Sequence, residues 1–259
     1  MTSPVVLRTL RFGTPLGLLA FWWFWSNGSE SLYFPPLSDV LDRFVEVWTG
    51  PAFRNDLVPS VVRFVVGFAL ALIIAIPLGT AFGLSSRLRR DALPLTEFSR
   101  SLPVAAIVPI PLLAFGPGFG MDVSLILFSA IFPILLATTD GVRGVDPQAV
   151  ETARVYGLNM RQVLREVILP AAMPPIFAGI RVALAIGISA MVIAGMLSSS
   201  QGIGAYVILA QQSFDVLGTW AGLVMIGLLG IVINGTFLLI QSRVLAWHTG
   251  WRRAAKEGS

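Results

Sequence analysis

The side chains that commonly catalyse reactions or bind metals are almost missing from this sequence. It has no cysteine, its one histidine is His248 and its only lysine is Lys256. No GxxxxGKS or GxxxxGKT segment is present to hold nucleotide phosphates, and no clustered His, Asp, Glu or Cys residues mark a reaction centre. We therefore expect a chain that is not an enzyme and that carries no cofactor or metal of its own.

The polar residues with the most informative spacing lie within residues 140–174. Asp146 followed by Pro147 is typical of a helix start, because Asp accepts a backbone N–H as N-cap and proline is tolerated at the first helical position. We expect a short helix from Gln148 to Tyr156. Gly157 then suits the left-handed backbone of a helix C-cap.

A second short helix is expected to follow the first. Asn159 and Gln162 have the spacing of a capping box, and the helix is expected to end before Pro170, because proline lacks an N–H and crowds the preceding turn. The two helices would form a compact elbow over residues 146–170. Such an elbow is either a rigid knob that transmits the movement of a partner or an interfacial linker.

The segments around this elbow are long and apolar. The chain of 259 residues is 55% hydrophobic and 12% charged, too apolar to cover itself with polar surface in water. Six segments approach the roughly 20 residues that a helix needs to cross a bilayer. We expect an all-α polytopic bundle, a single membrane domain over residues 1–259, whose first span is a retained anchor. The expected spans are Leu10–Trp25, Phe64–Leu84, Thr96–Phe115, Val123–Thr139, Ile176–Leu197 and Leu217–Ile240.

The basic residues predict the orientation of these helices. Of the 18 Lys and Arg residues, only Arg43, Arg54 and Arg63 fall outside when the N-terminus is placed in the cytoplasm. Positive charge collects on the cytoplasmic side of membrane proteins. We therefore expect a multi-pass protein of a bacterial inner (plasma) membrane with both termini cytoplasmic. The arginines are scattered over several inside segments, so no nucleic-acid partner is expected.

One segment on the expected outer side has helical spacing of its apolar residues. Residues 37–48 place apolar side chains on one face and charged side chains on the other, which predicts a short amphipathic helix. This outer-face helix would lie on the bundle or on the membrane surface, or it would help to receive a partner.

The interiors of the expected spans contain essentially no ionisable side chain. Arg63 and Arg181 lie near span ends, where we expect them to snorkel toward water. A transporter driven by protons or sodium usually carries an ionisable group within the membrane. If this chain transports actively, its energy must come from a partner. An ion-coupled secondary transporter is the alternative function, and a membrane enzyme is a third.

The elbow resembles a known motif. Glu151-Thr152-Ala153, Gly157 and Val167-Ile168-Leu169-Pro170 have the spacing of the EAA loop of binding-protein-dependent, type I ABC importer permeases, with Thr152 and Val167 as substitutions. The resemblance implies that the elbow is a cytoplasmic coupling helix that docks on an ATP-binding subunit. The residues expected to couple to that ATPase are Asp146, Glu151, Thr152, Ala153, Arg154, Gly157, Leu169 and Pro170.

The similarity extends over about residues 35–251. Arg100-Ser101-Leu102-Pro103 and the segment that follows are similar to the nitrate, sulfonate and taurine group of these permeases. The resemblance implies a second permease copy, expected as a homodimer, two subunits that bind ATP and Mg, and an extracytoplasmic solute-binding protein. It also implies a small anion as solute, such as a sulfonate, nitrate or carboxylate. Gly195 and Asn234 stand where the group often has acids, so the solute of any one subgroup is not carried over.

Prolines in the third expected span predict where the solute passes. Pro103, Pro109 and Pro111 each remove a backbone donor, and broken helices are tolerated in membranes only where protein or a watery cavity surrounds them. We expect this span to face the translocation path, with a structural kink as the alternative. Small residues of the fifth span could serve the path or close helix packing. The expected path residues are Arg100, Pro103, Pro109, Pro111, Ser189 and Gly195.

Overall fold

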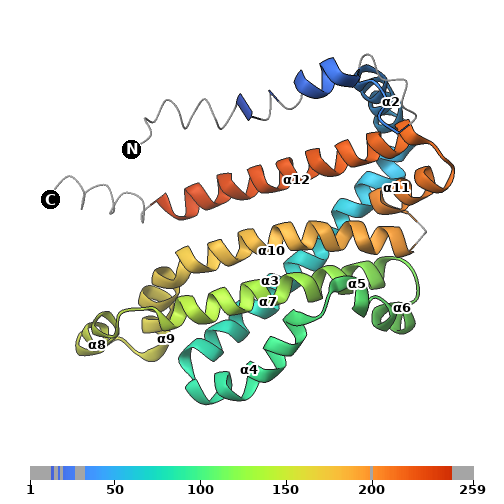
Figure 1. Ribbon diagram of the computed structural model, residues 1–259. Coiled ribbons are helices and arrows are strands. Elements are labelled where there is room, and N and C mark those ends of the chain that lie inside the picture. Colours follow the sequence, from blue (N-terminus) through green and yellow to red (C-terminus); the bar gives the residue numbers. More distant parts are fainter. Residues whose placement is uncertain (1–12, 15–16, 18–19, 27–32, 199–200, 247–259) are drawn as a thin grey trace.

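The computed structural model describes residues 13–14, 17, 20–26, 33–198 and 201–246. Within these ranges every regular element is a helix (Figure 1), which confirms the predicted all-α class. Four helical segments are long and apolar enough to cross a membrane: Phe53–Leu84, Phe119–Arg143, Met160–Leu197 and Val216–Val244. They contain the second, fourth, fifth and sixth expected spans. The first expected span, Leu10–Trp25, is described only in part, and its described residues 13–14, 17 and 20–25 are helical.

Three long helices form the centre of the bundle. α7 (Phe119–Arg143) packs against α3 (Val58–Leu84) along one side and against α10 (Leu169–Ser198) along another, and Figure 1 shows α7 and α10 side by side. Glycines permit this close approach. A Cβ added at Gly67 would lie 2.9 Å from Ile126, and one at Gly179 would overlap Ala137. Small residues at helix contacts allow the van der Waals packing that holds membrane helices together.

A second layer lies beside this bundle, with α12 running along α10. The amphipathic α2 (Leu37–Thr49) packs on α12 (Val216–Val244), where the Trp48 indole donates to the Ala221 carbonyl at 3.1 Å. α11 (Ile203–Gln212) lies between α10 and α12. Figure 1 shows α2, α6 and α11 at one end of the molecule, and α8 and α9 at the other.

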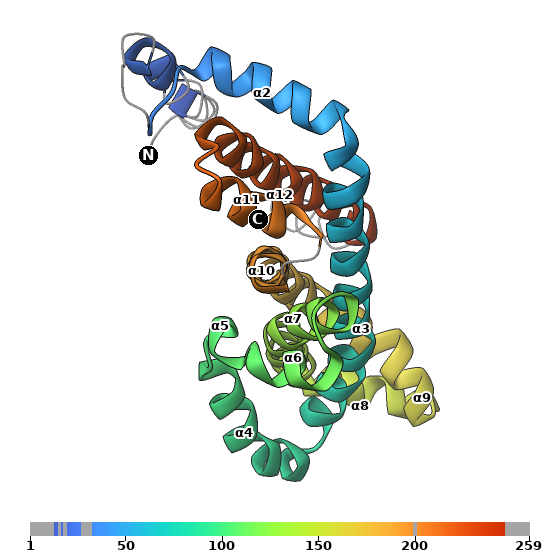
Figure 2. The ribbon, with the colours of Figure 1, turned by 90° about the vertical axis from the view of Figure 1, so that its right-hand side faces the viewer.

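The third expected span is not one helix, and the interruption that its prolines predicted is confirmed. α4 (Ser86–Ser101) is followed by the short helices α5 (Val104–Ile107) and α6 (Pro109–Phe115), and the two parts are bent by 98°. The bend falls at Leu102 and Pro103, which have extended backbone. Proline and the restricted residue before it account for the break. Figure 2 shows α4 turning away from the core before α5.

The helix expected to end before Pro170 does not end there. α9 (Met160–Gln162), the π-helical segment η2 (Val163–Ile168) and α10 form one continuous segment. Pro170 has no N–H to bond to a preceding carbonyl. In the wider π-helical turn before it, the Leu169 N–H bonds to the Leu164 carbonyl. Such a π-turn lets the helix absorb the proline instead of stopping.

Contrary to the expectation, the side chain of Arg63 does not reach toward water. Its side chain is buried, with the residue 8% exposed, and Nη1 lies 2.7 Å from Asp122 Oδ2 on α7 and 2.7 Å from the Gln201 carbonyl. The Ser60 hydroxyl beside it accepts from the Ile203 N–H at 2.9 Å. These bonds attach the start of α11 to the starts of α3 and α7.

Candidate functional site

The elbow has one side held by the bundle and one side left open. In α8 (Pro147–Val155), Ala153 is buried and belongs to the same hydrophobic cluster as Val163 and Ile168 of η2. At the end of the helix, Val155 is 87% exposed and Tyr156 is 81% exposed. Large apolar side chains at such exposure are typical of a surface that another molecule covers.

Hydrogen bonds fix the start of α8. Asp146 Oδ1 accepts from the Gln148 N–H at 2.9 Å, as its position before Pro147 predicts. The exposed Glu151 lies one turn further along, and the neighbouring Thr152 hydroxyl bonds back to the Gln148 carbonyl at 2.8 Å. The helix therefore begins at a defined residue and presents Glu151 at a defined place.

The turn after α8 is equally well defined. Gly157 has φ +79°, its N–H bonds to the Arg154 carbonyl, and the Leu158 N–H bonds to the Ala153 carbonyl. This pair of bonds is the Schellman arrangement, which favours glycine at the left-handed position. Asn159 and Gln162 then form the reciprocal capping box. Local sequence rules thus give the elbow its shape.

The elbow continues directly into two helices of the core. α7 ends at Arg143, three residues before the Asp146 cap of α8, and η2 passes into α10 at Leu169 without a break. Leu169 and Pro170 are half-buried at this junction. A displacement of α8 would therefore reach α7 and α10 through short, rigid connections.

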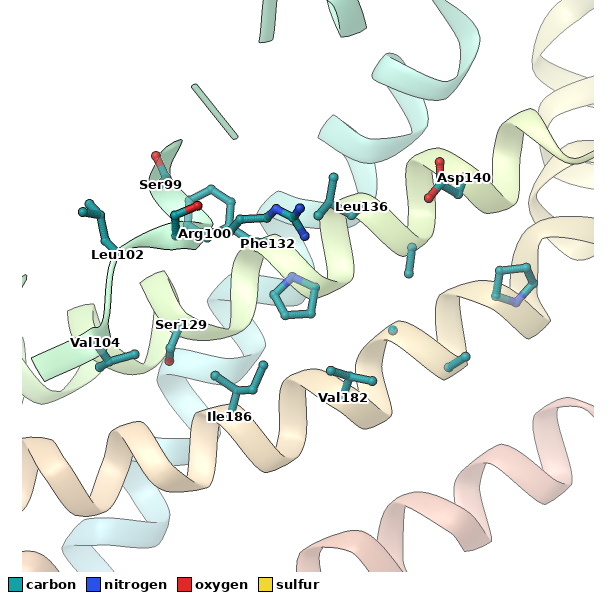
Figure 3. A pocket seen from close by; sticks show the side chains of 16 residues that line it. Ser99, Arg100, Leu102, Val104, Ser129, Phe132, Leu136, Asp140, Val182 and Ile186 are labelled. Carbon is teal, nitrogen blue, oxygen red and sulfur yellow. The ribbon is translucent and has the colours of Figure 1, made fainter. Parts of the chain in front are cut away.

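A cavity of about 730 Å³ lies between these same two helices and the bend after α4. Arg100 of α4 extends over it (Figure 3). The remaining polar lining is sparse, because apolar side chains of α7 and α10 form most of the wall. The lining residues are Ser99, Arg100, Ser101, Leu102, Val104, Ser129, Phe132, Pro133, Leu136, Ala137, Asp140, Pro175, Ala178, Gly179, Val182 and Ile186.

The charges of this cavity are already paired. Arg100 Nε donates to Glu97 Oε2 at 2.7 Å, one turn earlier on α4, and both side chains remain about half exposed. At the other end, Asp140 lies 3.6 Å from Arg143. An exposed pair of this kind contributes about 0.2–0.5 kcal/mol. The Arg100 guanidinium is therefore available to an anion that can compete with Glu97.

Of the six residues expected along the path, Arg100 lines this cavity and the other five do not. Pro103 is exposed at the bend, Pro109 is exposed on α6, and Pro111 borders a separate pocket of about 230 Å³. Ser189 is exposed and bonds to the Ala185 carbonyl.

Gly195 is buried against a neighbouring helix. A Cβ built on it would lie 3.1 Å from Gly204 Cα of α11. This residue serves close helix packing, the alternative that the sequence left open.

Sequence reasoning missed the part of the cavity formed by α7 and α10. Pro133 of α7 and Gly179 of α10 face each other there, where a Cβ at Gly179 would lie 2.9 Å from the Pro133 carbonyl. Pro133 lies within an apolar span as the prolines near Arg100 do, so the same signal was present in the sequence, although α7 continues unbroken through Pro133. Its significance depends on which helix lies opposite, which spacing along one segment does not reveal.

Known proteins are similar to this chain in sequence and in fold. The family model of the binding-protein-dependent transport system inner membrane component matches residues 67–246. The chain is 29% identical over 248 residues to the taurine transport system permease protein TauC of Escherichia coli, covering 93% of this chain and 90% of the relative. It is 32% identical over 247 residues to the bicarbonate transport system permease protein CmpB of Synechococcus elongatus, covering 91% and 86%.

Another relative and a solved structure agree with this. The putative aliphatic sulfonates transport permease protein SsuC of Bacillus subtilis is 31% identical over 216 residues, covering 83% of this chain and 78% of the relative. A chain of the MetNI methionine ABC transporter, solved in inward facing conformations, has the same fold with a TM-score of 0.63 at 17% identity, covering 74% of this chain and 95% of that one. The chain belongs to the binding-protein-dependent transport system inner membrane component family and is a permease subunit of an ABC importer.

Proposed function

We propose that this permease, paired with a second copy of itself, moves a small anion across a bacterial inner membrane. An extracytoplasmic binding protein would deliver the anion, and two cytoplasmic subunits that bind ATP and Mg would supply the energy. The chain itself performs no catalysis. The observation that carries the proposal is the continuity between the elbow and the cavity, since α7 and α10 both line the cavity and both lead into the elbow.

The elbow is the proposed contact with the ATP-binding subunit. Its exposed tip combines the carboxylate of Glu151 with the apolar side chains of Val155 and Tyr156. A surface of this kind fits a cleft in a partner, with the apolar residues buried at the centre. Closure of the ATPase pair would then move α8 as a unit and change the spacing of α7 and α10.

An anion is the proposed solute for two reasons. The relatives carry names that refer to taurine, aliphatic sulfonates and bicarbonate. In addition, Arg100 is the one basic side chain among the residues that line the cavity. A guanidinium matches the geometry of carboxylate and sulfonate oxygens and stays charged at every physiological pH.

The orientation follows from the same arrangement. Placing the elbow in the cytoplasm would put α2, α6 and α11 on the outer side, where the binding protein would arrive. The distribution of the basic residues supports this orientation, with both termini proposed to be cytoplasmic.

Reconstitution of the transporter tests the proposal. The permease would be placed in proteoliposomes with its ATP-binding and binding-protein subunits, and uptake of radiolabelled taurine, butanesulfonate and bicarbonate measured with and without ATP. We expect ATP-dependent uptake of at least one anion. Uptake by the permease alone, driven by a proton or sodium gradient, would instead establish a secondary transporter.

A further inference from the structure

A second pocket of about 430 Å³ lies under the elbow, apart from the solute cavity. Three arginines from different elements line it: Arg89 of α4, Arg143 at the end of α7 and Arg154 of α8. No carboxylate is among its described lining residues. Three guanidinium groups around one small space repel one another unless an anion lies between them.

Little of this positive charge is neutralised within the chain. Within the described part of the chain, the one ion pair of Arg143 is the long contact to Asp140, at 3.6 Å, and Arg89 and Arg154 form no ion pair within 4 Å. Arginines presented together in this way are well suited to a phosphate group, whose oxygens accept several N–H donors at once.

The position of the pocket indicates where the phosphate comes from. Two membrane-spanning segments end at the pocket, at Leu84 and Arg143. Apolar side chains, Leu84, Val142 and Ile168 among them, line it together with the arginines. Leu84 and the nearby Leu88 are exposed at 43% and 50%. A headgroup in the pocket would thus have apolar surface beside it for acyl chains.

We propose that this pocket binds the phosphate of an anionic phospholipid in the leaflet on the elbow side of the membrane. Basic pockets between membrane helices at the cytoplasmic boundary are suited to such headgroups. The bound phosphate would bridge Arg89 at the start of α4 and Arg154 in the elbow. The lipid would therefore hold the elbow against the start of α4. Arg100 lies at the other end of this helix.

Native mass spectrometry of the full-length protein in detergent tests this inference. Dioleoyl-phosphatidylglycerol would be titrated against the wild type, the pocket variant Arg89→Gln/Arg154→Gln and the control Arg87→Gln/Arg90→Gln. The control also removes two arginine charges, both from the start of α4, but its residues do not line the pocket. We expect the pocket variant to bind this lipid more weakly than the control by a factor on the order of tenfold.

Further arms separate the possible anions. Dioleoyl-phosphatidylcholine, whose choline balances its phosphate, should bind more weakly than the glycerol lipid and be insensitive to the pocket variant. An equal loss of binding in the pocket variant and the control would overturn the inference, because charge alone would explain it. Binding of inorganic phosphate at the arginines without any preference for lipid would overturn the lipid assignment. The lipid assignment would also be overturned if the pocket variant bound lipid like the wild type but no longer bound the ATP-binding subunit. The pocket would then receive a carboxylate of that protein.

Discussion

Gly179 of α10 lies directly against Ala137 of α7, in the wall of the cavity beneath Arg100. An added Cβ would overlap the Ala137 side chain, so the two helices must separate to accept any larger residue. We expect Gly179→Ala to destabilise the protein by about 1–3 kcal/mol, the usual cost of overpacking a tight contact. Thermal unfolding in detergent measures this. Gly227→Ala is the control, since nothing lies within 4 Å of its added Cβ, and an equal loss there would contradict the argument.

The buried pair of Arg63 and Asp122 gives a second prediction. Removing one partner leaves a charge uncompensated in an apolar environment, which typically costs about 3–5 kcal/mol. We therefore expect Asp122→Leu to lower the thermal midpoint more than the double variant Arg63→Met/Asp122→Leu. A double variant that is less stable than the single variant would show that the cost of Asp122→Leu does not come from leaving the Arg63 charge unpaired. Glu46→Gln, which breaks an exposed pair with Arg43, should have little effect.

The shape of the elbow gives a third prediction. Gly157 has a positive φ, so Gly157→Val should strain the turn by about 1–2 kcal/mol and displace the Val155 and Tyr156 tip. Glu151→Lys reverses the charge of the exposed face without straining the backbone. We expect both changes to reduce solute-stimulated ATP hydrolysis and uptake by the reconstituted complex. Gly235→Ala, at a helical glycine with free space around it, is the control, and unchanged activity in both elbow variants would refute the coupling role.

These elbow residues show what could be predicted from sequence. The caps at Asp146 and Asn159 and the left-handed Gly157 depend on neighbours within a few residues, so local rules gave them correctly. The Arg63–Asp122 pair joins residues 59 positions apart, and neither helix shows which helix it will meet. The expected orientation places both charges at outer ends of spans, but a shared side does not show which spans are neighbours.

The bend near Arg100 shows a second limit. Three prolines correctly indicated an interrupted helix, but proline removes donors without fixing the direction in which the chain continues. The 98° turn and the cavity beneath it depend on how α7 and α10 fill the space. For the same reason, Arg100 could be selected from the sequence while Pro133 and Gly179 opposite it could not.

The Arg43–Asp215 contact predicts a dependence on acid. Burial tends to raise the pKa of Asp215, but hydrogen bonds from Arg43 and the Gly218 N–H outweigh burial and hold this pKa below its ordinary value of 3.8. The folded state thus favours the carboxylate, and this stability is present above pH 3.8 and lost as the pH falls through the lowered value. Thermal midpoints between pH 7 and pH 3 should fall less steeply in Asp215→Asn than in the wild type. Parallel curves would argue against the pairing.

The pairing of Arg100 with Glu97 leads to a last prediction about transport. If Glu97 pairs with the Arg100 guanidinium while the cavity is empty, Glu97→Gln removes a competitor of the anionic solute and should lower the solute concentration for half-maximal uptake by about 1.4- to 2.3-fold. Arg100→Gln should reduce the uptake rate by about tenfold or more, because the anion then meets an apolar wall without a counter-charge. Arg100→Lys keeps the charge and should retain part of the activity. Uptake by the reconstituted complex, measured with saturating binding protein, distinguishes these variants. Equal uptake by the wild type and Arg100→Gln would show that the solute does not pass this residue.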